Sequence, residues 1–464
     1  MRNLIGSKSF YKMVLAIAIP IMIQNGITHF VGLLDNIMVG QVGTEQMSGV
    51  AIANQLLFVF NLCIFGGVSG AGIFTAQFFG QKNHEGVKET FRFKLIVCSL
   101  LTVVSLCIFY FWGKDLIKLY LHDASGVGTL ETTLMYSKNY LFIMLISLLP
   151  FAWGQAYSST LRETGETVVP MIAGIVAVFV NLILNYILIF GKLGIRPLGC
   201  EGAAIATVIS RFVECGIIIY WTHKHTEKNL FIKGAYKNFK VSIELSKQIL
   251  IKGMPLLVNE AFWAGGMAML MQCYSVRGLA VVAGLNIATT IANLFNIVFI
   301  ALGNGVGIIV GPLLGAGKMK EAKDTAYKMI FFSVMCCLVM GGLMTLIAPV
   351  FSTIYNTSKE IKDLATSFIR IAALCMPIYA FLHATYFTIR SGGKTFITFL
   401  FDSVFLWIIT VPVAFVLAYF TGLNILIVYL TCQLVDLIKC AIGYYMLKKD
   451  IWLHNLVEDK AVSL

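Results

Sequence analysis

Charged side chains are scarce in this sequence. Only 12% of its 464 residues are Asp, Glu, Lys or Arg, whereas 58% are apolar. A soluble globular chain carries about a quarter charged residues, so this chain has too little polar surface to cover a water-facing body of its size. Several apolar runs, among them 95–112, 171–190 and 329–350, are long enough to cross roughly 30 Å of hydrocarbon as helices. The composition excludes a soluble enzyme and predicts a membrane protein.

Signals for disulfide, metal and nucleotide chemistry are also missing. The 11 cysteines lie almost entirely within apolar runs, without a CxxC pair or a His/Cys metal spacing, so they are typical of small buried side chains. The seven histidines form no group, and the sequence has no GxxxxGK[ST] loop that would cradle ATP. We therefore expect no cofactor, no catalytic residues and no ATP-driven transport. The N-terminal apolar run is too long for a cleavable signal peptide.

The basic residues fall in short gaps between apolar runs, although the net charge of +12 alone would suit nucleic acid. Alternate gaps differ in charge, with 24 Lys and Arg on one side of the predicted membrane and 8 on the other. The segment between the second and third runs, for example, holds Lys82, Lys88, Arg92 and Lys94. Positive residues are retained on the cytoplasmic side, so we expect a multi-pass plasma-membrane protein with both termini in the cytoplasm and no nucleic-acid partner.

The apolar runs predict an all-α membrane protein with twelve transmembrane helices. The longest polar stretch falls after the sixth run, which predicts an N-terminal lobe over 1–222, a cytoplasmic linker over 223–247 and a C-terminal lobe over 248–464. The predicted spans are 13–36, 50–78, 93–112, 136–160, 168–190, 200–221, 248–273, 280–314, 326–350, 361–389, 396–420 and 423–447.

The two halves repeat. A shift of 235 positions superposes Pro20 on Pro255 and five glycines of the first half on glycines of the second, and a shift of 228 aligns LRETGET (161–167) with IRSGGKT (389–395). Six helices per copy give both copies the same orientation, so the sequence predicts two pseudo-symmetric six-helix bundles in a parallel repeat. Bundles of this kind hold a substrate between them and rock against each other, which favours a transporter.

Polar residues inside the predicted spans are the candidate site residues, because an ionisable group in the bilayer is costly unless it is paired or hydrated. Asp35 shares a helical face with Gln24 and Thr28, which suits a cavity wall, although Asp35 could instead end the helix at the surface. Asn181 and Asn185 share a face of the fifth span, and Thr207 lies on the sixth. These oxygens could bind Na⁺ with Asp35, or the amides could serve only interhelical hydrogen bonds.

The second half has a similar set. Glu260 lies near mid-membrane, where it could exchange protons or attract a lipophilic cation; alternatively it forms a structural ion pair with Arg370. Asp436 and Lys439 are three residues apart and could neutralise each other. The candidates in this half are Glu260 and Trp263 on 248–273, Tyr379 and His383 on 361–389, and Asp402 and Trp407 on 396–420.

Several segments resemble the multidrug and toxic compound extrusion (MATE) transporters over nearly the whole chain. They are LLDNIMVGQVG (33–43), QFFGQKNHEGV (77–87), GCEGAAIATVISR (199–211), GPLLGAGKMKEA (311–322) and the two segments LRETGET and IRSGGKT. The resemblance implies twelve helices in two lobes and cation-coupled efflux.

The resemblance also implies site residues. Some members bind a cation through an Asp, an Asn, a second Asp and a Thr, and the matching positions here are Asp35, Asn181, Asn185 and Thr207. Asn185 replaces the second acid, which removes one negative charge. Other members carry an acid near the position of Glu260 and another on the tenth helix. At that second position this sequence has Tyr379, with His383 one turn on, and we expect Asp402 to take over part of the role.

We therefore expect a secondary antiporter that exports amphipathic or cationic organic compounds in exchange for Na⁺ or H⁺. Cation coupling is assigned to Asp35, Asn181, Asn185, Thr207, Glu260 and Asp402, and the substrate cavity to Gln24, Thr28, Trp263, Tyr379, His383 and Trp407. The expected partners are a small organic substrate and membrane lipid, and the expected form is a monomer, with no metal other than Na⁺ at Asp35. The alternatives are a flippase for lipid-linked precursors and a membrane-embedded enzyme.

Overall fold

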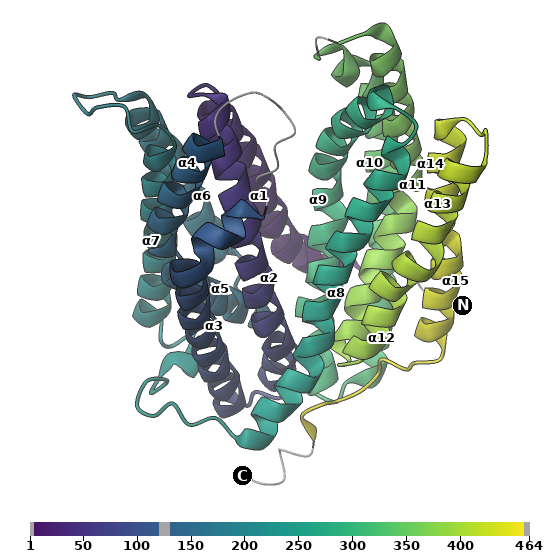
Figure 1. Cartoon of the computed structure of the whole chain (residues 1–464). Coiled ribbons are helices and arrows are strands. Elements are labelled where there is room, and N and C mark those ends of the chain that lie inside the picture. Colours follow the sequence, from purple (N-terminus) through teal and green to yellow (C-terminus); the bar gives the residue numbers. More distant parts are fainter. Residues whose placement is uncertain (1–3, 120–129, 356, 459–464) are drawn as a thin grey trace. The chain divides into compact units, whose positions relative to one another are not determined.

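The computed structural model describes residues 4–119, 130–355 and 357–458, and every regular element in these ranges is a helix (Figure 1). Ten helical segments are long and apolar enough to cross a membrane, and α4 with α5 makes an eleventh span that is bent by 50°. The helix α8, with 33 residues, completes twelve long segments. The prediction of an all-α membrane protein with twelve membrane helices is confirmed.

The chain forms two compact units. Unit 2 consists of Ile23–Thr75 and His84–Leu250. Within it α6 packs along α7, and α3 packs against α4 and α5. The helices that contribute to this unit are α1 (Lys8–Gly40), α2 (Thr44–Gly80), α3 (His84–Lys118), α4 (Leu130–Leu145), α5 (Leu148–Glu163), α6 (Val168–Phe190) and α7 (Gly199–Lys224), with the short η1 (Leu230–Ile232).

Unit 1 consists of Met1–Met22, Ala76–Asn83 and Ile251–Leu464. Its core lies where α9, α10 and α11 pack together, around Met344, Phe368 and Ala373. The helices of its main segment are α8 (Ile243–Ser275), α9 (Leu279–Gly315), α10 (Met319–Thr353), α11 (Lys359–Ser391), α12 (Thr395–Phe399), η2 (Leu400–Val404), η3 (Leu406–Thr410), α13 (Val411–Phe420), α14 (Ile425–Leu434) and α15 (Asp436–Lys448).

The compact units follow the two sequence halves except at two segments. The first turns of α1 and the last turn of α2 belong to unit 1, although both helices come from the N-terminal half. The predicted linker 223–247 lies entirely in unit 2 and is packed there. Arg92 of α3 donates hydrogen bonds to the carbonyls of Ala235 (2.8 Å) and Gly234 (2.9 Å), and the ring of Phe231 lies 5.2 Å from that of Phe91.

The internal repeat is visible in the backbone. Three pairs of positions are superposed by the shifts of 235 or 228 residues and have a positive φ in both halves. This conformation favours Gly over residues that carry a side chain. These turns therefore have the same shape in both halves. The pairs are Gly43 (φ 145°) with Gly278 (116°), Lys82 (59°) with Gly317 (73°), and Gly165 (90°) with Gly393 (72°).

The last turns of α2 and α9 cross in direct backbone contact within unit 1. A Cβ atom on Gly80 would lie 1.9 Å from the carbonyl oxygen of Pro312, and one on Gly315 would lie 1.9 Å from the carbonyl oxygen of Gln77. The two contacts are equivalent under the shift of 235 positions. Only Gly leaves room for helices to approach this closely.

A segment near the C-terminus covers this crossing. The side chain of Gln77 accepts a hydrogen bond from the backbone of Leu456 (2.7 Å) and donates one to the carbonyl of Ser391 (2.9 Å). Asn455 donates to the carbonyl of Gly315 (3.1 Å). Trp452, within the same segment, is completely buried. Residues 450–457, which we call the C-terminal strap, therefore fix the end of α2 to α9 and α11.

Two predicted spans are not regular α-helices, and a proline explains each. The predicted helix 136–160 is broken between α4 and α5, because Pro150 cannot donate to the carbonyl four residues earlier. The predicted helix 396–420 contains two π-helical turns, η2 and η3, directly before Pro412. Such wide turns are often found at functional sites, and Asp402 lies in the first of them.

Candidate functional site

In unit 2, Asp35 lies against the two predicted asparagines. The buried stripe of α6 includes Ala177, Asn181 and Asn185, which places both amides toward the neighbouring helices α1 and α7. Asn185 Nδ2 donates to Asp35 Oδ1 at 2.6 Å and lies 3.1 Å from Asn181 Oδ1, while the amide of Asn181 lies 3.2 Å from Thr207 Oγ1. The structure therefore brings together all four residues predicted for the N-terminal cation site.

The amide of Asn181 has two useful orientations. One of the two terminal atoms of this amide, oxygen in one orientation and nitrogen in the other, lies 3.1 Å from both carboxylate oxygens of Asp35. With Nδ2 turned toward Asp35, the amide donates to the carboxylate and its oxygen accepts from Thr207. With Oδ1 turned toward Asp35, three oxygens face one another, an arrangement that favours a cation between them. Asn185 Oδ1 is buried without a hydrogen-bond partner and supplies a further acceptor.

These ligands suit a hard monovalent cation, because all of them are carboxylate, amide or hydroxyl oxygens. The described residues contain no group of three or more His, Cys, Asp and Glu that could hold a metal ion. Among the described side chains, no Lys or Arg lies within salt-bridge distance of Asp35. Among the described side chains, neutral amides therefore meet the negative charge of Asp35.

Gln24 and Thr28 lie on α1 before Asp35. The side chain of Gln24 packs beside Gly174 of α6, where a Cβ atom would lie 3.1 Å from its Nε2. The hydroxyl of Thr28 donates to the carbonyl of Gln24 at 2.8 Å, within its own helix. Gln24 therefore shares the α1–α6 contact with Asp35.

In unit 1, Asp402 differs from Asp35 because it forms an ion pair. Lys439 Nζ lies 2.8 Å from Asp402 Oδ1, and Asn259 Nδ2 donates to Asp402 Oδ2 at 3.2 Å. Ser403 donates to Asn259 Oδ1 at 2.7 Å and so orients that amide. Lys439 was expected to neutralise Asp436; instead it lies in direct contact with Asp402, and Asp436 interacts with it at longer range.

Glu260 follows Asn259 on α8 and lies in the same region. Its basic neighbour is Arg390, whereas the alternative from the sequence was Arg370, which is exposed at a different place on α11. Asp402 is a second charged neighbour of Glu260. The carboxylates of Glu260 and Asp402 therefore belong to one cluster that also contains Lys439 and Arg390.

The four predicted cavity residues of unit 1 differ in their surroundings. Trp407 donates to the carbonyl of Phe262 at 2.8 Å, and Trp263 is half exposed. The hydroxyl of Tyr379 donates to the side chain of Gln433. His383 packs among aromatic rings, with ring centroids 5.4 Å away at Phe299, 6.4 Å at Tyr386 and 5.2 Å at Phe387.

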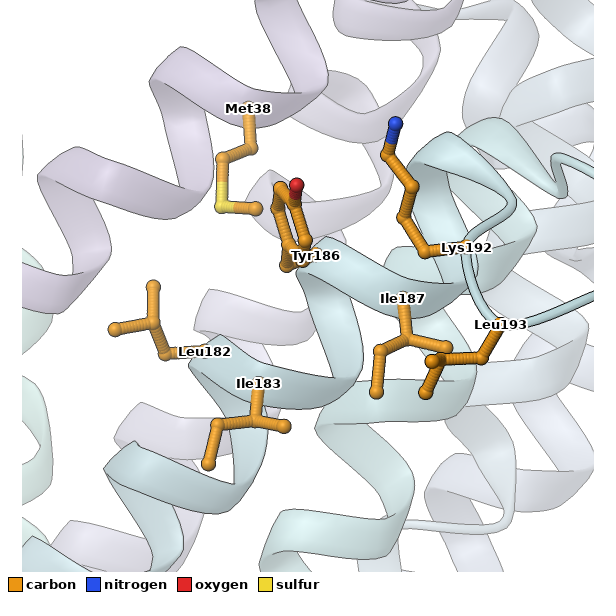
Figure 2. Close-up of a pocket in the computed structure, with 7 residues that line it drawn as sticks. All are labelled: Met38, Leu182, Ile183, Tyr186, Ile187, Lys192 and Leu193. Carbon is orange, nitrogen blue, oxygen red and sulfur yellow. The ribbon is translucent and has the colours of Figure 1, made fainter.

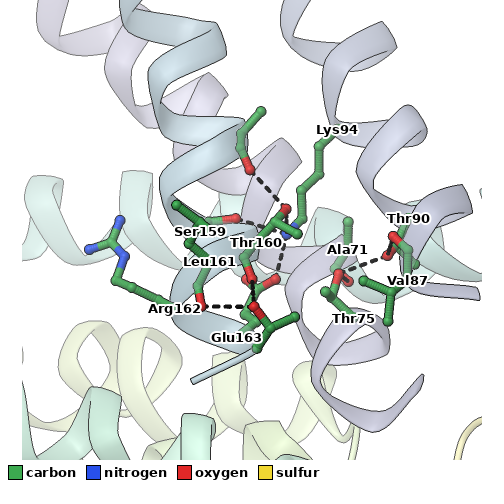
Figure 3. A network of polar contacts seen from close by, with 12 residues as sticks. Ala71, Thr75, Val87, Thr90, Lys94, Ser159, Thr160, Leu161, Arg162 and Glu163 are labelled. Atoms are coloured by element: carbon green, nitrogen blue, oxygen red, sulfur yellow. Dashed lines mark hydrogen bonds and ion pairs between the residues drawn. The ribbon is translucent and has the colours of Figure 1, made fainter. Parts of the chain in front are cut away.

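A further buried ion pair in unit 2 was missed from the sequence (Figure 3). Lys94, expected in a surface connection, lies inside α3 and is fully buried. Its ammonium group contacts the carboxylate of Glu163 and donates to Ser159 (2.8 Å) and Thr160 (3.1 Å). Gly72 leaves the space that Glu163 occupies. The available signal was the position of Lys94 inside the predicted span 93–112, but the count of basic residues assigned it to the preceding connection.

Comparison with known proteins identifies the family. The MatE family model matches residues 20–187 and 255–419, so the two matched segments begin 235 positions apart, at Pro20 and Pro255. A probable multidrug resistance protein NorM of Thermotoga maritima is 25% identical over 415 residues, which cover 89% of this chain and 87% of that protein. The probable multidrug resistance protein YoeA of Bacillus subtilis is 25% identical over 414 residues, covering 88% and 87%.

The fold is that of a solved MATE transporter in a straight conformation, with a TM-score of 0.86, 20% identity and 97% of each chain covered. This likeness confirms the two-lobe arrangement of twelve helices that the repeat predicted. Since the family model covers more than half of the sequence, the chain belongs to the MatE family and is a membrane transporter of the multidrug efflux type.

Proposed function

We propose that this transporter is a secondary antiporter that exports amphipathic or cationic organic compounds in exchange for inward Na⁺ or H⁺. It would work in the plasma membrane as a monomer with both termini in the cytoplasm, in contact with membrane lipid. The multidrug resistance relatives support export of small organic molecules. The charge bias of the connections supports the orientation.

The observation that carries the proposal is the difference between the two aspartates. Asp402 already has an ammonium partner, Lys439, whereas among the described side chains Asp35 accepts hydrogen bonds from neutral groups and has no basic partner. A carboxylate without a basic partner gains the most from binding Na⁺ or a proton, because either removes a net negative charge from the membrane interior. Asp35 is therefore the proposed coupling residue, and Asn181, Asn185 and Thr207 are its proposed ligand partners.

Coupling follows if the cation binds the outward-open and inward-open states unequally. A ligand shifts a conformational equilibrium only by its difference in affinity for the two states. In unit 2 the cation would replace the Asp35–Asn185 hydrogen bond with ion–oxygen contacts, which changes how α1 is held against α6. Glu260 and Asp402 are proposed to attract the cationic substrate, with Trp263 and Trp407 as aromatic contacts.

Ethidium efflux from cells under an imposed Na⁺ or H⁺ gradient tests the proposal. Wild type should follow one gradient, and Asp35→Asn should lose that dependence at unchanged abundance in the membrane. Asp115→Asn is the matched control, because Asp115 is an exposed carboxylate at the end of α3. Gradient-driven efflux that persists in Asp35→Asn would refute the assignment of Asp35. A wild type that moves ethidium under neither gradient would refute export of this substrate class.

A further inference from the structure

The helix α6 has two distinct faces. Its buried stripe carries Asn181 and Asn185, whereas its exposed side chains are large and apolar and follow one another at helical spacing. A continuous apolar stripe of this kind suits contact with acyl chains, because the bilayer, unlike water, does not penalise its exposure. The stripe consists of Val168, Ile172, Val176, Phe179, Ile183 and Tyr186.

A pocket of about 690 Å³ opens at the end of this stripe, between α1 and α6 (Figure 2). Met38 of α1 lines one side, and Leu182, Ile183 and Tyr186 of α6 line the other. The volume lies within the range of small-molecule sites in proteins. Because Ile183 and Tyr186 belong to the exposed stripe, the pocket opens toward the same surroundings as that stripe.

The turn after α6 lines the edge of the pocket with Lys192 and Leu193. Leu193 adopts φ 57°, a left-handed conformation that is strained for a residue other than Gly, and its side chain is 84% exposed while lining the pocket. The preceding Lys192 extends over the ring of Tyr186, with its ammonium 6.0 Å from the ring centroid. The turn therefore presents one apolar and one cationic side chain at the pocket.

The two polar groups of the pocket lie on the same side of it. In Figure 2 the Lys192 ammonium, the Tyr186 hydroxyl and Met38 lie toward the top of the view, and Leu182 and Ile183 lie below them. Lys192 is the single charged residue among those that line it. The pocket is therefore mainly apolar, with one ammonium and one hydroxyl on the same side of it.

We propose that this pocket binds an acidic phospholipid of the surrounding membrane. One acyl chain lies along Leu182 and Ile183, and the headgroup phosphate accepts hydrogen bonds from Lys192 and Tyr186. A negative phosphate complements the ammonium, whereas an organic cation is repelled by it. The site is distinct from the proposed coupling site and does not depend on it.

The lipid would contact both helices of the coupling site. Met38 lies one turn beyond Asp35 on α1, and Tyr186 follows Asn185 on α6. A molecule that touches Met38 and Tyr186 together holds α1 against α6 next to the Asp35–Asn185 hydrogen bond. Lipid binding therefore adds to the stability of this helix pair.

Native mass spectrometry of the full chain, delipidated and then titrated with phosphatidylglycerol or phosphatidylcholine of the same acyl chains, tests the proposal. Phosphatidylglycerol should bind wild type more tightly than phosphatidylcholine. Lys192→Gln should weaken phosphatidylglycerol binding about tenfold, as expected for the loss of a charge-assisted hydrogen bond. Arg196→Gln is the matched control, because Arg196 is a basic residue of the same connection that does not line the pocket.

A second pair of variants tests the apolar part of the pocket. Ile183→Trp fills the pocket and should reduce binding of the acidic lipid, whereas Ile172→Trp changes the same exposed stripe outside the pocket and should leave it unchanged. The proposal is overturned if Lys192→Gln binds phosphatidylglycerol as wild type does, or if both lipids bind equally. It is also overturned if inorganic phosphate or ethidium displaces the lipid, because the pocket would then belong to a free anion or to the transported substrate. Mass spectrometry measures lipid binding and not transport, so the outcome does not depend on whether Asp35 is the coupling residue.

Discussion

Gly80 and Gly315 occupy equivalent positions of the two repeats, and each faces a backbone carbonyl of the other's helix at a distance that excludes a side chain. The partner carbonyls, at Gln77 and Pro312, are themselves equivalent under the same shift of 235 positions. The crossing of α2 and α9 therefore has local two-fold pseudo-symmetry, as expected when two copies of one helix pack against each other through the same surface.

This crossing should tolerate no added methyl group. Gly315→Ala would place a Cβ atom 1.9 Å from the carbonyl oxygen of Gln77, so a helix must shift, and overpacking of this kind costs about 1–3 kcal/mol. We expect a thermal unfolding midpoint several degrees below wild type. Gly342→Ala is the control, because a Cβ atom on Gly342 in α10 meets nothing within 4 Å. Equal midpoints for the two variants would contradict the close crossing.

The Lys94–Glu163 pair should be strongly coupled. Lys94→Met leaves the carboxylate of Glu163 without its ammonium partner and should cost about 3 kcal/mol, the usual effect of breaking a buried pair. The double variant Lys94→Met/Glu163→Gln should recover most of this loss. Lys118→Met, which removes an exposed pair with Asp115, should change little. Thermal unfolding of wild type, Lys94→Met, Glu163→Gln and the double variant gives the coupling, and a loss in the double variant equal to the sum of the two single losses would show that the pair is not coupled.

Restoring an acid at position 185 should strengthen Na⁺ binding. Asn185→Asp adds a second negative charge at a buried position next to Asp35, and Coulomb attraction to a nearby cation then rises. We expect the Na⁺ concentration for half-maximal thermal stabilisation to fall by about tenfold. Asp35→Asn in the same background should reverse the gain. An unchanged Na⁺ response would indicate that these oxygens do not bind the ion together.

Removal of Lys439 should leave the buried negative charge of Asp402 without its ion-pair partner. Lys439→Ala removes the ammonium partner of Asp402 and leaves the amide of Asn259 as a hydrogen-bond partner, and a loss of about 3 kcal/mol is expected. Methylammonium in the buffer should restore part of the thermal stability, because it can take the place of the missing ammonium group. Lys449→Ala, at an exposed position beyond α15, should show neither the loss nor the rescue. If methylammonium stabilises both variants equally, its effect does not arise at Asp402.

The apolar runs and the repeat of the sequence predicted the helices and the repeated halves, whereas its charge pattern did not predict which buried charges form pairs. Helical runs and the shift of 235 positions predicted the long helices and the repeat, because both depend on residues close in the chain or on repeated spacing. The grouping of Asp35 with Asn181 and Asn185 was expected from helical faces and family resemblance, and the structure brings these residues together.

The partners of buried charges were harder to predict. Lys439 is three residues from Asp436 but pairs with Asp402, and Lys94 pairs with Glu163, because packing between helices decides which opposite charge is near. Sequence spacing ranks only partners on the same helix. The bend near Pro150 and the π-helical turns before Pro412 lie close to prolines that the sequence shows, yet apolar runs alone do not indicate a break or a change of helical pitch.

The C-terminal strap has a consequence for biosynthesis. Gln77 near the end of α2 hydrogen-bonds with Leu456, a partner 379 positions later in the chain, so this contact forms only after Leu456 has been made. Until then the last turn of α2 has its crossing with α9 but not its hydrogen bond to the strap. A nascent chain would therefore complete the packing of this α2 end long after the helix itself has been synthesised.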